Sequence, residues 1–231
     1  MNTMPTPQTT PPFTPEALGI LFEKTNFSSF QKPGFPSHYW APLLSACSGT
    51  RRDEIFFLTP DDVTQRHGIW VMQIRACGSQ AATSGAAIRV VPIHPVLKKL
   101  GFLEFVEERR QTRPLERLFS EYKAGLEHAG MLFSRAFAGW VKTTAGRLPS
   151  DQQYLFGEDF HFPSLRALFR AEAIRSGMSE DAWRRLQGGG SPAPLAPDQE
   201  RSALERADAE MQRVNIEGCF PALHSYEALI A

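Results

Sequence analysis

The chain of 231 residues is long enough for one well-buried domain with flexible ends. With 42% hydrophobic and 22% charged residues, it has neither the charge excess of a disordered chain nor the apolar bias of a membrane protein. Lysine plus arginine balances aspartate plus glutamate at 25 each, so the net charge alone does not predict nucleic-acid binding.

The first half of the chain predicts four helices and two strands. Residues 1 to 12, rich in proline and threonine, predict a tail. Helical spacing of apolar residues and helix-start signals predict helices at residues 15 to 24, 38 to 49, 51 to 58 and 94 to 110. Residues 28 to 37, rich in Ser, Gly and Pro, predict a connection. The β-branched stretches 68 to 75 and 88 to 93 predict two paired strands.

The second half predicts helices and no further strand. These helices are expected at residues 114 to 128, 134 to 145, 164 to 177, 179 to 187 and 198 to 213. The Gly- and Pro-rich residues 188 to 199 predict a linker. The expected fold class is therefore mainly α with a small antiparallel β-sheet (α+β). Residues 13 to 187 are expected to form the core of the domain, and residues 200 to 231 a C-terminal helix and tail.

The three cysteines predict no special chemistry. Cys47, Cys77 and Cys219 are odd in number and far apart, which argues against a disulfide framework or a zinc site. Buried thiols are expected, and no metal or cofactor is predicted. The first residues lack the basic and apolar regions of a secretion signal, and no run of about 18 apolar residues occurs. The expected location is the cytoplasm, without a membrane partner.

Four sequence blocks occur in an order that is similar to that of a known family. They are WAPLLSACSGTRRDEI (40 to 55), RVVPIHPVLKKLGFL (89 to 103), FPSLRALF (162 to 169) and FPALHSYEAL (220 to 229). Together they resemble the catalytic domain of phage-integrase tyrosine recombinases, from about Phe13 to the C-terminus. The resemblance implies an integrase-like fold and leaves no room for the family's separate N-terminal DNA-binding domains.

The resemblance implies a chemistry in which a tyrosine attacks a DNA phosphodiester, with no cofactor. Two arginines hold the phosphate oxygens where negative charge develops. They correspond to Arg51 in Ser-Gly-Thr-Arg and to Arg166 in Pro-Ser-Leu-Arg, while Glu54 corresponds to a residue that supports the fold. Without the surrounding block, Arg51 would be interpreted as a solvated arginine at a helix start. Arg52 is expected to be its solvated neighbour.

The other catalytic positions of the family are not matched. Thr83 takes the place of the hairpin lysine, Pro163 that of the motif histidine, and glycines that of the later Gly-His/Trp motif. No tyrosine occurs between residues 188 and 213, and Tyr226 is expected to be a packed or half-exposed aromatic of the tail. General acid–base groups contribute about 10²- to 10⁴-fold each, so recombinase catalysis is expected to be lost or strongly impaired.

His161 is the nearest candidate to replace the missing histidine, since it lies two residues before that position. Pro163 favours the first helical position and biases Phe162 toward an extended backbone. An extended step of two residues moves a side chain by about 6 to 7 Å, which argues against the replacement.

These matches and losses predict an integrase-like DNA-binding protein, related to DNA integration and recombination, in which the family's catalysis is impaired or lost. The candidate contacts with the DNA backbone are Arg51, Arg89, Lys98, Lys99 and Arg166. Two alternatives stay open. One is an active recombinase that uses Tyr226 or a tyrosine of another subunit. The other is a protein-interaction partner of a recombinase, or a self-associating protein, whose acidic C-terminal tail packs on a neighbour without DNA binding.

Overall fold

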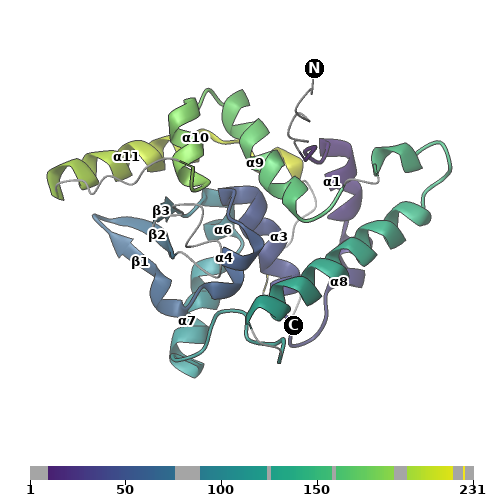
Figure 1. The fold of residues 1–231 in the computed structure, drawn as a ribbon, viewed down its shortest axis with the longest axis horizontal. Helices are drawn as coiled ribbons and strands as arrows, with labels where there is room; N and C mark the ends of the chain where they lie inside the picture. The colour runs from purple at the N-terminus through teal and green to yellow at the C-terminus, as the bar shows by residue number, and fades with distance from the viewer. Residues whose placement is uncertain are drawn as a thin grey trace, which may run out of the picture.

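A computed structural model describes residues 10–75, 89–123, 126–157, 160–189, 197–220 and 226. Helices predominate, and a three-stranded antiparallel sheet lies at one end of the molecule (Figure 1). The helices are α1 (Pro15–Leu21), α2 (Lys24–Phe30), α3 (Ser37–Ser48), α4 (Arg52–Phe57), α6 (Pro95–Lys99), α7 (Phe102–Thr112), α8 (Leu126–Gly146), α9 (Pro163–Arg175), α10 (Glu180–Leu186) and α11 (Pro197–Arg213). The expected fold class, mainly α with a small antiparallel sheet, is confirmed.

The sheet has the order β1-β2-β3. Its strands are β1 (Val63–Arg66), β2 (Ile69–Ile74) and β3 (Arg89–Pro92). The expected antiparallel pairing of β2 with β3 is confirmed, with Met72 opposite Val91. β1 was not predicted, and it pairs with β2 through a tight turn at His67 and Gly68. Both turn residues have positive φ, at 50° and 82°, as a type I′ hairpin turn requires.

The two faces of the sheet have different neighbours. Because side chains alternate along a strand and Val63 pairs with Met72, the side chains of Val63, Trp70 and Arg89 share one face. Arg66 lies on the opposite face, where its guanidinium pairs with Glu200 of α11 at 3.1 Å. In Figure 1, α11 extends beside the sheet, away from α8. The first face is turned toward the helices of the core.

α3 is the central helix of the core. Every residue from Ser37 to Ser48 is buried, and α3 contacts α4, α6, α8 and α9. Trp40 packs against Phe102 and Phe105 of α7, which ties the aromatic core together. Gly49 ends α3 at φ +65°, as its position after the apolar stripe predicts.

Three of the predicted helices are wrong in extent. The helix expected at 15 to 24 ends at Leu21. The helix expected at 94 to 110 is divided into α6 and α7, because Gly101 has φ +91° and interrupts the helical backbone. The helix expected at 114 to 128 is absent over residues 114–123. Arg113 precedes Pro114, and a proline disfavours the helical region for the residue before it. Arg113 accordingly has φ −145°. α8 begins at Leu126 and includes the predicted helix 134 to 145.

α2 occupies the start of the segment that was expected to be only a connection. Its sequence KTNFSSF has poor helix formers, so propensity did not predict it. The Glu23 carboxylate caps the helix by accepting from the backbone N–H groups of Thr25 and Asn26. Phe27 and Phe30 lie against Trp140 of α8, and this tertiary packing stabilises the helix.

Within the described ranges, no helix is both long and apolar enough to cross a membrane. Cys47 and Cys219 are buried free thiols, as expected, and Cys77 lies outside the described residues. The described residues also contain no group of three or more side chains that could hold a metal ion.

Candidate functional site

Arg51 and Arg166 are brought together by the helices on which they lie. Arg51 immediately precedes α4, and Arg166 lies in the first turn of α9. α3 packs against both helices, and Gly49 at its end, two residues before Arg51, lies close to Phe169 of α9. Burial lowers the pKa of Arg166, and the guanidinium of Arg51 is close enough that its charge lowers this pKa further.

A buried carboxylate stands beside this pair. The Arg89 guanidinium donates from Nη1 to Oε1 of Glu54 at 2.7 Å and from Nη2 to Oε2 at 2.8 Å. The backbone N–H of Arg51 also donates to Glu54 Oε2, at 2.7 Å. Burial raises the pKa of Glu54, but the hydrogen bonds and charges of Arg89 and Arg51 outweigh it and lower the pKa overall. Glu54 therefore stays ionised and supports the fold, as expected.

Gln187 fixes the guanidinium of Arg166 from the end of α10. Arg166 Nη2 donates to the backbone carbonyl of Gln187 at 2.7 Å, and Gln187 Nε2 donates to the backbone carbonyl of Arg166 at 2.9 Å. Gln187 itself packs over Gly49, where a Cβ would lie only 2.7 Å from its Nε2. A glycine at position 49 is therefore needed both for its φ and for this close approach.

The charges of this arginine cluster, which we define as Arg51, Arg89 and Arg166 with Glu54, do not balance. Three guanidiniums face one carboxylate, which leaves a formal charge of +2 on these four side chains. Burial and the charges of Arg51 and Arg89 lower the pKa of Arg166 to about 10, while Glu54 opposes this shift, so Arg166 remains protonated at neutral pH. Its Nη1 is buried and has no hydrogen-bond partner among the described residues.

The cluster has the properties of an anion site. Within the described part of the chain, no hydrogen bond or ion pair of the Arg51 side chain is present. Planar guanidiniums match the oxygens of a phosphate or carboxylate, and a bound anion would neutralise the excess charge. Arg89 differs from the other two arginines, because its donors are used by Glu54 and by the carbonyl of Leu186. Arg89 thus positions the cluster rather than offering free donors.

His161 lies on the surface at the start of α9. Pro163 occupies the first helical position, as predicted. The expected extended backbone at Phe162 is wrong: its φ of −50° and ψ of −41° are helical, so the chain turns back before the proline. The turn is closed by the N–H of Ser164, which donates to the carbonyl of His161 at 2.8 Å. The side chain of His161 is exposed, while its backbone shapes the start of the helix.

Tyr226 is a packed aromatic, as expected. Its half-buried ring contacts Tyr39, Trp40 and Phe105, and its N–H donates to the carbonyl of Leu100 at 3.2 Å. Burial raises the pKa of Tyr226; Arg109 opposes this, while Glu108 and Glu121 add to it. A raised pKa is the opposite of what a tyrosine nucleophile needs.

The remaining predicted positions lie elsewhere. Lys99 pairs with Glu217, and Lys98 lies near enough to His94 to lower its pKa, so the contacts of both lysines are outside the arginine cluster. Arg52 was expected to be solvated, but it is half-buried and donates to Asp53 and Ser134. Thr83, at the place of the family's lysine, lies outside the described residues.

Sequence reasoning did not identify Gln187 as part of the site. Its only local feature is its position at the end of a predicted helix, and its partner Arg166 is 21 positions away. No family model, curated protein or solved structure matches the chain.

Proposed function

We propose that this chain is an integrase-like protein that holds a backbone phosphate of DNA in its arginine cluster and does not cleave the strand. The proposal is carried by one observation, the buried and unpartnered Nη1 of Arg166 beside the unpaired guanidinium of Arg51 among the described residues. Burying a charged donor without a partner is costly, and an anion at this position would remove the cost.

A phosphodiester fits the cluster better than an isolated carboxylate does. Its two non-bridging oxygens can accept from two guanidiniums at once, and DNA presents such groups at regular spacing. The order of sequence blocks that resembles the integrase catalytic domain supports the same ligand, since Arg51 and Arg166 are the two positions that match its phosphate-binding arginines. Contacts to phosphate position a protein on DNA without reading its sequence, so sequence-independent binding is expected.

Loss of strand cleavage is the second part of the proposal. Pro163 stands where the family has the motif histidine. His161 is exposed and lies two residues earlier, so it does not supply the missing side chain. Burial raises the pKa values of Tyr39, Tyr122 and Tyr226, which makes each a poorer nucleophile. A role in integration or recombination would then be to bind DNA, alone or beside an active recombinase.

The test is the binding of a fluorescein-labelled DNA duplex of about 20 base pairs, followed by anisotropy at about 50 mM KCl. We expect the affinity to fall about tenfold or more in Arg51→Ala/Arg166→Ala, because two charge-assisted contacts are lost. The matched control is Arg113→Ala/Arg147→Ala, which removes the same charge from exposed positions just after α7 and just after α8. Arg51→Ala alone serves if the double variant does not fold, since the Arg51 side chain makes no hydrogen bond or ion pair among the described residues. Equal affinities in all variants would refute the proposal.

A further inference from the structure

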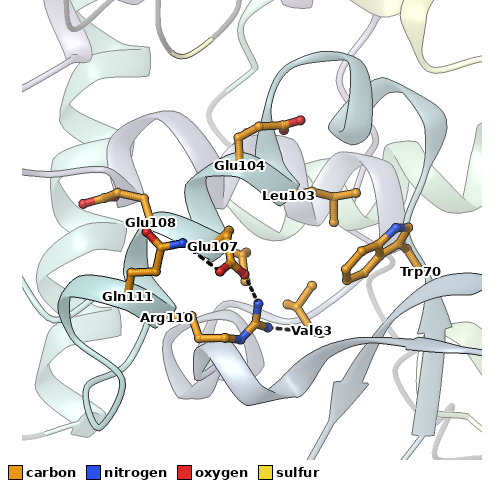
Figure 2. Close-up of a pocket in the computed structure, with 9 residues that line it drawn as sticks. Val63, Trp70, Leu103, Glu104, Glu107, Glu108, Arg110 and Gln111 are labelled. Carbon is orange, nitrogen blue, oxygen red and sulfur yellow. Dashed lines mark hydrogen bonds and ion pairs between the residues drawn. The ribbon is translucent and has the colours of Figure 1, made fainter.

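A groove lies between α7 and the hairpin of β1 and β2. Its volume is about 570 Å³, and Figure 2 shows the side chains that line it. Val63 and Trp70 contribute from the sheet, and Leu103 and Val106 from α7. Trp70 and Leu103 are only partly buried and lie near each other on one side of the groove in Figure 2. The groove therefore exposes a small apolar floor that nothing in the chain covers within the described ranges.

The rim of the groove is acidic. Glu104, Glu107, Glu108 and Gln111 follow the i, i+3, i+4, i+7 pattern, so they share one face of α7. Arg110 is the one cation that lines the groove, so three carboxylates and one guanidinium give it a formal charge of −2. The charge of the groove is negative, whereas that of the arginine cluster is positive. The groove would repel phosphates, which excludes DNA as its occupant.

Arg110 is not available to a ligand. Its guanidinium pairs with Glu107 and also donates to the carbonyls of Pro60 and Val63, at 2.8 and 2.9 Å. These contacts hold α7 to the start of β1 and neutralise Glu107. Glu104 has no ion pair among the described residues, and Glu108 has its nearest cation, Nε of Arg109, at 3.9 Å. Glu104 and Glu108 are therefore the two carboxylates that can receive a basic partner.

We propose that this groove docks a segment of another protein in which an apolar side chain is flanked by lysine or arginine. The apolar side chain would pack against Trp70 and Leu103, and the basic side chains would pair with Glu104 and Glu108. The chain's own segments outside the described residues contain no lysine or arginine, so they do not supply this chemistry. An apolar anchor surrounded by complementary charge is the arrangement of a specific interface, and the small groove fits a transient, micromolar contact.

This docking surface goes beyond the proposed function and does not depend on it. The carboxylates of α7 and the arginine cluster are distinct groups, so each can be changed without the other. A protein that binds both DNA and a basic segment of a partner could recruit that partner to DNA. The two activities are separated by measuring peptide binding and duplex binding on the same variants.

The probe is the fluorescein-labelled peptide acetyl-GKRLLKRLG-amide, with acetyl-GEELLEELG-amide as its acidic counterpart. We expect the protein to bind the basic peptide and not the acidic one. Glu104→Lys/Glu108→Lys should weaken binding about tenfold or more, because attraction becomes repulsion at two positions. Asp151→Lys/Glu205→Lys, which makes the same charge change at exposed positions elsewhere, should leave the affinity within about twofold.

The apolar floor of the groove is tested with Trp70→Ala, and with Leu103→Ser if Trp70→Ala does not fold. Either variant should also lower the affinity for the basic peptide about tenfold. Duplex affinity should not fall in any groove variant. Equal loss of peptide binding in both double charge reversals would overturn the proposal, and so would no binding by the unaltered protein at about 1 mM peptide. Sedimentation as a dimer that Glu104→Lys/Glu108→Lys disrupts would also overturn it, because the occupant would then be a second copy of this chain.

Discussion

Arg89 and Glu54 form a bidentate ion pair, with both guanidinium–carboxylate distances below 3 Å at 2.7 and 2.8 Å. The side chain of Glu54 is 5% exposed and that of Arg89 is 10% exposed, so the pair is largely removed from water. The pair joins α4 to β3, and Arg89 also donates to the carbonyl of Leu186 at the end of α10. Three elements thus meet at one guanidinium, and Arg51 and Arg166 are positioned around it.

Breaking this pair should strongly destabilise the protein. Glu54→Gln leaves the buried Arg89 cation without its counter-charge, so we expect the free energy of unfolding to fall by about 3 to 5 kcal/mol in urea titrations. Glu180→Gln is the matched control, because it removes a carboxylate from the exposed pair with Arg184 and should change stability by about 0.5 kcal/mol or less. Similar losses in the two variants would show that the pair does not organise the fold.

Gly49→Ala should disturb both the fold and the site. The added Cβ would lie 2.7 Å from Nε2 of Gln187 and 2.7 Å from Cδ1 of Phe169, at a residue with φ +65°. Strain and overpacking together predict a loss of about 2 kcal/mol or more. Gly177→Ala is the control, because its φ is +80° but a Cβ there meets nothing within 4 Å, which limits its cost to strain. If thermal unfolding places both variants at the same stability, the close packing of Gln187 over Gly49 is wrong.

Two buried histidines predict how stability depends on pH. Burial lowers the pKa of His38, whose ring contacts the carbonyl of Phe30 at 2.6 Å and the hydroxyl of Tyr122 at 2.8 Å. Burial also lowers the pKa of His94, although the carbonyl of Val214 opposes this. The unfolded chain takes up protons at a higher pH than the folded protein does, so stability is lost as pH falls below about 6.5.

The expected loss is up to about 1.4 kcal/mol per pH unit for each histidine, down to its folded pKa. Urea titrations between about pH 7 and pH 5 measure it. His38→Gln should reduce the slope, because it removes one of the two buried imidazoles. An unchanged slope in His38→Gln would contradict the neutral, buried state of this side chain.

The unaltered protein should form no covalent adduct with a nicked DNA substrate that traps phosphotyrosine. Tyr226 packs against Tyr39 and Trp40, and burial raises its pKa, so its hydroxyl is not activated. A denaturing gel that separates free from protein-linked DNA reads the outcome. An adduct that disappears in Tyr226→Phe would instead support an active recombinase.

The elements that sequence predicted well have local signals. α3 follows from its apolar spacing and the glycine that ends it, and α10 from the hydroxyl of Ser179, which accepts from the N–H of Ala182. α6 and α7 were joined in the prediction because their apolar positions continue across Gly101, and only the left-handed φ of that residue divides them. α2 was missed because tertiary packing, which sequence alone does not reveal, outweighs its weak helix propensity.

The candidate site was predicted only in part, because several of its contacts join residues that are far apart in the sequence. Arg51 and Arg166 were found through the order of sequence blocks, and the structure brings them together. The pairing of Arg89 with Glu54 joins residues 35 positions apart, and that of Arg166 with Gln187 joins residues 21 positions apart. Such contacts depend on how helices and strands pack, so no local pattern identifies them.

The most direct test of phosphate binding by the arginine cluster is the salt dependence of duplex affinity. Each phosphate contact releases condensed counterions, so the slope of log K against log salt concentration changes by about 0.9 per contact. We predict that Arg51→Ala/Arg166→Ala makes this slope shallower by about 1.8 relative to the unaltered protein, while Arg113→Ala/Arg147→Ala leaves it unchanged. Identical slopes in all three proteins, or no duplex binding at low salt, would contradict the proposal that Arg51 and Arg166 hold DNA phosphate.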